Sequence, residues 1–169
     1  MYNESRRRRQ NRSSNSDVPP SFSRETPDPR SARLWFRQAE EHFSSARQIS
    51  QLGSAPLQWI AFQIHQAAEV ALKAAQYNLT GCADDANSNT LRDIASAVCR
   101  HRYVSSSNLV KVAGDLERLN CQFDKPRYPE SRRSETSGQA YQRFHVDEAL
   151  KLCEDLFDLV RDIIGIKEL

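Results

Sequence analysis

Residues 123–133 (FDKPRYPESRR) combine basic side chains, a tyrosine and two prolines. Pro126 and Pro129 restrict the backbone around Arg127 and Tyr128 and are incompatible with a helix there. A guanidinium on a stiff segment loses little entropy when it binds a phosphate or carboxylate, and the tyrosine adds a stacking face and a hydroxyl. Arg127 and Tyr128 are therefore candidate ligand-binding residues. The alternative is structural: Tyr128 plugs the core, and Arg127 pairs with an acid of its own chain.

Lys73 is a third candidate ligand-binding residue, because it follows the apolar run AAEVAL at residues 67–72. A lysine on or beside a buried helical stripe must extend to solvent, pair with an acid or meet an anionic ligand. Glu69 lies one helical turn earlier and offers the intramolecular pair. The sequence leaves all three interpretations of Lys73 open.

Sequence motifs of common enzyme classes are missing. The chain has no GxxxxGK[ST], no GxGxxG after a strand, no HExxH and no GxSxG. Its histidines are scattered without metal-ligand spacing, and His65 is interpreted as a polar residue inside a helix. We therefore predict a protein that is not an enzyme, without catalytic residues, metal or cofactor.

The N-terminal residues 1–27 are rich in Arg, Ser, Asn and Pro, and we predict a disordered basic tail. The first 30 residues hold seven arginines against four acids, so the basic excess belongs to this end of the chain. Arg6–Arg9 could bind nucleic acid weakly, as a solvated tail does, or act in nuclear import. No signal peptide or membrane-length apolar stretch is visible, and the four cysteines form no CxxC pair. We expect a cytoplasmic protein with reduced thiols and no membrane partner, the alternative location being the nucleus.

Apolar residues spaced three to four apart predict helices throughout residues 28–169. The first begins behind Asp28–Pro29 and continues to about Gln51, with Gly53 expected to close it. The second begins near Pro56, is apolar on more than one side, and ends at Gly81. It is the expected central helix.

Three more helical segments follow. The predicted elements are a short helix from Leu91 to Val98 capped by Thr90 and Asp93, a helix from about Ser107 to Leu119, and a helix from Phe144 or His145 to Gly165 with Asp147 and Glu148 in its first turn. No alternating strand pattern occurs. We therefore predict an all-α, up-and-down bundle of four to five helices. The long loop before the last helix, residues 120–141, contains the RYP segment, and loops of such length tend to be functional or disordered.

Four segments, in this order, resemble the HEPN family (higher eukaryotes and prokaryotes nucleotide-binding). They are ARLWFRQAEEHFSSAR, WIAFQIHQAAEVALKAA, KPRYPES and AYQRFHVDEALKLCEDLFDLV, all within residues 28–165. The chain looks most similar to the C-terminal HEPN domain of sacsin. The resemblance implies a helical bundle that pairs as a homodimer and binds a nucleoside triphosphate such as GTP or ATP at a basic cavity. RYP of the family falls on Arg127, Tyr128 and Pro129, and the second lysine of the family's EKALKA-type run falls on Lys73.

Two further properties of HEPN relatives bear on function. One branch contains RNases with an RxxxxH motif near the last helix, whereas the only such string here, Arg37–His42, lies in the first helix. Five helical positions rotate the side chain by about 140°, so these two do not converge. The sacsin domain accompanies a J domain, but no HPD tripeptide occurs here, so chaperone-related proteins would be separate partners. The alternatives to nucleotide binding are a dimerisation or adaptor module without ligand and, less favoured, an RNase.

Overall fold

Five helices form the regular structure in the computed structural model, which describes residues 26–83, 90–101, 107–119, 136 and 138–166. The helices are α1 (Pro29–Ser50), α2 (Leu57–Thr80), α3 (Leu91–Cys99), α4 (Ser107–Arg118) and α5 (Arg143–Ile164). No strand occurs within the described ranges. The predicted all-α bundle is confirmed.

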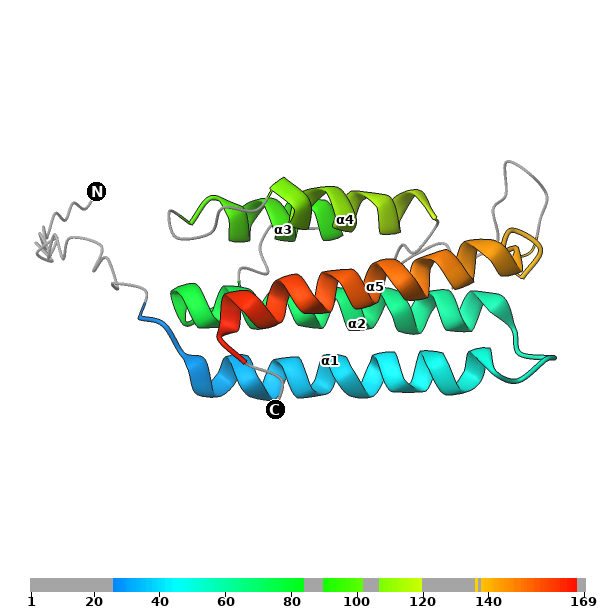
Figure 1. Cartoon of the computed structure of the whole chain (residues 1–169), viewed down its shortest axis with the longest axis horizontal. Helices are drawn as coiled ribbons and strands as arrows, with labels where there is room; N and C mark the ends of the chain where they lie inside the picture. The colour runs from blue at the N-terminus through cyan, green and yellow to red at the C-terminus, as the bar shows by residue number, and fades with distance from the viewer. Residues whose placement is uncertain (1–25, 84–89, 102–106, 120–135, 137, 167–169) are drawn as a thin grey trace, which may run out of the picture.

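The bundle is built around α2, as the sequence predicts. α1 lies alongside α2 and runs in the opposite direction, while α5 packs on both and runs parallel to α2 (Figure 1). The shorter helices α3 and α4 pack on each other, α3 also contacting α2 and α4 contacting α5. Both other long helices therefore have a face against α2.

Small side chains on α2 allow this close packing. Ala67, Ala71, Ala74 and Ala75 have no exposed surface, so neighbouring helices contact α2 almost at its backbone. Larger side chains fill the remaining space between α1 and α5, where Phe157 packs on Phe36 and Phe43 with ring centroids 5.2 Å apart in each pair. These apolar contacts supply the main driving force for folding.

Several helix ends have the predicted residues. The Asp28 carboxylate accepts a 3.0 Å hydrogen bond from the Ser31 N–H, with Pro29 as the first helical residue. The Thr90 hydroxyl accepts from the Asp93 N–H at 3.1 Å and donates to the Asp93 carboxylate at 2.8 Å. At the other ends, Gly81 closes α2 and Gly165 closes α5 in the left-handed conformation that glycine adopts without strain.

Two details of the predicted helix ends are wrong, although both ends lie within about a residue of their predicted positions. Gly53 is not the left-handed cap of α1, because the helix ends at Ser50 and Gln51 remains right-handed, its N–H bonding the Gln48 carbonyl. When the last turn of a helix tightens into hydrogen bonds between residues three apart, its carbonyls are satisfied without a left-handed glycine. α5 begins at Arg143, earlier than predicted, so Asp147 and Glu148 lie beyond its first turn.

Some predicted segments lie in parts of the chain that the structure does not describe. Residues 1–25 of the predicted tail, and most of the loop between α4 and α5, lie outside the described residues. The boundary at residue 28 stays a prediction.

Cys82, Cys99 and Cys153 are free thiols. None of the five helices is long and apolar enough to cross a membrane.

Candidate functional site

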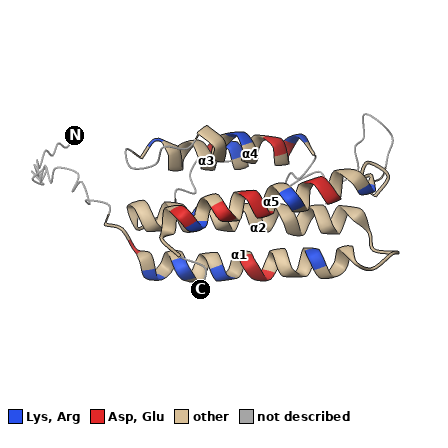
Figure 2. Ribbon diagram, viewed as in Figure 1, with Lys and Arg blue, Asp and Glu red and all other residues tan. Residues whose placement is uncertain are grey.

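A row of polar side chains, His65, Glu69 and Lys73, follows one face of α2; we name it the α2 polar row. Lys73 Nζ lies 3.0 Å from Glu69 Oε1, and His65 Nε2 lies 3.4 Å from Glu69 Oε2. The spacing of four residues places all three on one side of the helix. Glu69 and Lys73 are the only Asp, Glu, Lys or Arg residues of α2, which is otherwise free of such charges along its length (Figure 2).

The α2 polar row is largely withdrawn from water. The His65 side chain is 5% exposed, Lys73 19% and Glu69 25%. The hydrogen bond with His65 and then the interaction with Lys73 lower the pKa of the Glu69 carboxyl from 4.5 to about 2, although burial opposes this. Glu69 is therefore ionised at neutral pH, and its negative charge is shared between two basic side chains.

Aromatic rings lie beside the lysine end of the α2 polar row. Trp35 of α1 and Tyr77 of α2 stack with centroids 5.2 Å apart, and Lys73 Nζ lies 5.9 Å from the Trp35 ring centroid. A cation over an indole face is an attractive arrangement. Lys73 thus meets both a carboxylate and an aromatic ring, and the intramolecular pair predicted as one of its alternatives is present.

The other two predicted site residues, Arg127 and Tyr128, lie outside the described residues. Of the three, the structure therefore locates Lys73 alone. It brings Lys73 together with Glu69, Trp35 and Tyr77, and the assignment of all three as ligand-binding residues stays a prediction.

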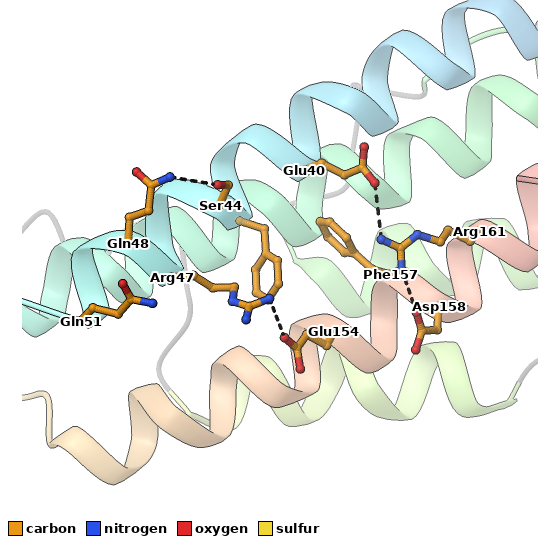
Figure 3. Close-up of a pocket in the computed structure, with 10 residues that line it drawn as sticks. Glu40, Ser44, Arg47, Gln48, Gln51, Glu154, Phe157, Asp158 and Arg161 are labelled. Atoms are coloured by element: carbon orange, nitrogen blue, oxygen red, sulfur yellow. Dashed lines mark hydrogen bonds and ion pairs between the residues drawn. The ribbon is translucent and has the colours of Figure 1, made fainter. Parts of the chain in front are cut away.

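A second candidate site, which the sequence did not predict, is a groove of about 610 Å³ between α1 and α5. We name it the α1–α5 groove (Figure 3). Arg47 of α1 pairs with Glu154 of α5 at 3.4 Å, and Arg161 of α5 pairs with Glu40 at 3.4 Å and with Asp158 at 2.8 Å. Two ion-pair groups therefore join the helices across the groove.

The floor of the α1–α5 groove is aromatic. The Arg161 guanidinium carbon lies 5.5 Å from the Phe36 centroid and 5.9 Å from that of Phe157, and Arg47 lies 6.0 Å from that of Phe43. Two arginines against three carboxylates give this groove a formal charge of −1. Such a charge disfavours the binding of a triphosphate in this groove.

Sequence reasoning missed the α1–α5 groove because its pairs join residues far apart in the chain. Glu40, Phe43 and Arg47 recur at helical spacing on α1, as do Glu154, Asp158 and Arg161 on α5. These two stripes were visible in the sequence. Their mutual contact depends on the packing of α1 against α5, which helical periodicity does not specify.

His42, the histidine of the RxxxxH string in α1, contacts a side chain of α2. His42 of the Arg37–His42 string lies 3.0 Å from the Gln63 side chain of α2, measured from Nδ1 to Oε1. Arg37 is exposed. Within the described ranges, no three His, Cys, Asp or Glu residues gather as metal ligands would.

Comparison with known proteins agrees with this helical arrangement. The family model described as "HEPN domain" matches residues 32–163, which include α2, α3 and α4 completely and nearly all of α1 and α5. The chain belongs to the HEPN family. The α2 polar row and the α1–α5 groove both lie within the matched part of this HEPN domain.

A solved structure supports the same fold. The crystal structure of TT1696 from Thermus thermophilus superposes with a TM-score of 0.65 at 26% sequence identity. The alignment covers 78% of this chain and 97% of the Thermus protein. A search of curated proteins gives no match.

Proposed function

We propose that this HEPN domain is a non-enzymatic homodimeric module that binds a nucleoside triphosphate, GTP or ATP, or a similarly anionic ligand. Lys73 and Arg127 would meet the phosphates, and Tyr128 would stack on or orient the ligand. The proposal extends to a sacsin-like role beside chaperone-related proteins, which the resemblance alone suggests.

The observation that carries this proposal is the position of Lys73. Its side chain is mostly buried, and its Nζ lies 5.9 Å from the centroid of Trp35, which stacks on Tyr77, on the central helix of a HEPN domain. Lysine binds phosphate as a point charge, and aromatic faces suit a nucleobase. Glu69 already pairs with this lysine, so a bound phosphate would have to compete with a carboxylate 3.0 Å away.

This competition predicts how each substitution should change the affinity for nucleotide. Isothermal titration with GTP and ATP should detect binding to the wild-type protein, and Lys73→Gln and Arg127→Ala should each weaken it at least tenfold. Glu69→Gln should tighten it, because the competing carboxylate is gone. Lys111→Gln, which removes an exposed cation of α4, is the matched control and should leave binding unchanged. A folded wild-type protein that gives no heat at millimolar nucleotide would refute the ligand claim.

Homodimerisation is the second part of the proposal. Leu52 lies in the connection from α1 to α2 and is 60% exposed, and Trp59 lies in the first turn of α2 and is 49% exposed. This connection is at one end of the bundle (Figure 1). We infer that both side chains belong to the dimer interface, because large exposed apolar patches are typical of protein interfaces. Light scattering, with and without nucleotide, should give twice the mass of one chain. A Trp59→Ser variant should have a measured mass closer to that of the monomer. A single-chain mass for the wild-type protein would contradict the proposed homodimer.

The adaptor interpretation is the competing function, and the Glu69–Lys73 pair favours it. If this pair is purely structural, Lys73 has its partner within the chain and needs no ligand. Tyr128→Ala should then lower the melting temperature, Arg127→Ala should change little, and no variant should alter nucleotide binding because none occurs.

A further inference from the structure

A small pocket of about 250 Å³ lies where the C-terminal ends of α2 and α3 meet. Leu79 and Thr80 of α2 and Val98 of α3 line it, with Arg100 and His101 directly after α3. It shares no lining residue with the α1–α5 groove and includes no member of the α2 polar row. Most ligand sites span about 300–1,000 Å³, so a molecule that fits here must be small.

A buried amide marks this pocket as a site that needs a hydrogen-bond partner. Gln76 also lines the pocket, and this residue is 6% exposed. Its Oε1 is buried and accepts no hydrogen bond from any residue that the structure describes. A buried polar atom without a partner is costly and uncommon in folded proteins. Because the last torsion of a glutamine side chain is broad, the amide can reorient at low cost when a donor enters the pocket.

The charge around the pocket is basic. Arg100 is exposed at the pocket, His101 is half-buried, and no Asp or Glu belongs to the described residues that line it. An arginine at the end of a helix holds a carboxylate through directed N–H bonds, and no acid among these lining residues competes for it. The pocket therefore combines an acceptor that has no donor among the described residues with a cation that suits an anion.

We propose that this pocket, which we name the α2–α3 pocket, binds a small carboxylic acid that also carries an amide N–H, as an N-acylated amino acid does. The ligand N–H donates to Gln76 Oε1, and its carboxylate lies against Arg100. The inference is independent of nucleotide binding, since it uses neither Lys73 nor the segment that contains Arg127 and Tyr128.

The probe is N-acetylglycine, compared with acetate, which has the anion alone, and N-methylacetamide, which has the N–H alone. Amide resonances of Leu79 and Val98 should shift and saturate at millimolar N-acetylglycine, the range expected for so small a ligand. Each half-probe should bind at least tenfold more weakly. Cys82 lines the same pocket and is exposed, so alkylation of its thiol, followed by peptide mass spectrometry, should slow when N-acetylglycine is bound.

Two variants test the named contacts. Gln76→Met keeps the length of the side chain without its amide, and should abolish binding while leaving the melting temperature equal or higher. Arg100→Gln should weaken binding at least tenfold, whereas Lys111→Gln, an exposed cation on α4, should not. The proposal is overturned if acetate binds as well as N-acetylglycine, or if Gln76→Met still binds. A water molecule as the only partner of Gln76 would appear as no saturable binding of any probe, which also overturns it.

Discussion

Replacing Glu69 by glutamine should destabilise the protein in a way that depends on pH. The folded-state pKa of about 2, against the ordinary 4.5, corresponds to about 3 kcal/mol of stability at neutral pH, at 1.36 kcal/mol per pH unit. Glutamine has nearly the same shape and keeps part of the hydrogen bonding to His65. We therefore expect Glu69→Gln to lower the free energy of unfolding by about 2–3 kcal/mol at pH 7.

The pH dependence follows from the direction of the pKa change. A carboxyl whose pKa is lowered on folding contributes its full stability above about pH 4.5 and loses it as the pH falls towards 2. The difference in unfolding free energy between wild type and Glu69→Gln should therefore shrink from pH 5 to pH 3. Urea denaturation followed by circular dichroism, at several pH values across this window, measures it directly.

Glu154→Gln is the matched control for this experiment. Glu154 is half-exposed and pairs with Arg47 on the surface, so its loss should cost at most about 1 kcal/mol. A Glu69→Gln variant as stable as wild type at pH 7 would refute the stabilising role of the α2 polar row. A loss that is the same at pH 7 and pH 3 would show that shape, and not the charge of Glu69, stabilises the fold.

Substitutions at four further positions test the helix ends and the packing of the core. Gly165→Ala should lower the free energy of unfolding by about 1 kcal/mol, because the backbone there is left-handed and the space around it is open. Gly81→Ala should cost about 1–3 kcal/mol more, because the new methyl would collide with the Thr26 carbonyl. Equal melting temperatures of the two variants would contradict this. Thr90→Ala should lower the unfolding free energy by about 1 kcal/mol and Thr90→Ser should restore most of it, as denaturant titration can show. Phe157→Ala should cost about 3–5 kcal/mol in the same assay, and a loss below about 1 kcal/mol would mean that its ring is not packed as described.

The helices could be predicted because their signals are local. Asp28 caps α1, Thr90 caps α3 and the glycines after α2 and α5 adopt the left-handed conformation, each as expected from the residue type alone. Gly53 misled the prediction because α1 ends before it, through a backbone bond from Gln51 that any residue type except proline can make. Residue type indicates where a helix can end but does not select between two nearby closures.

The candidate sites could be predicted only where their contacts are local. The Glu69–Lys73 pair was predicted as an alternative because the two residues lie four apart on one helix. The Arg161–Glu40 pair joins residues 121 positions apart, and it requires a contact between α1 and α5 that no sequence pattern indicates. The same holds for Gln76, whose lack of a donor among the described residues is a property of the packing around α2 and α3.

The alanines of α2 restrict how this domain can evolve. Ala67, Ala71, Ala74 and Ala75 have no exposed surface, so a larger side chain at any of them would push a neighbouring helix away. Substitutions at these positions should be confined to glycine, serine or cysteine, while exposed positions of α1 and α5 remain free to vary. In a library of single variants, the intolerant positions should therefore trace the contact lines of α2 with its neighbours. The helix contacts of a HEPN domain could be mapped in this way by measuring which single variants remain folded.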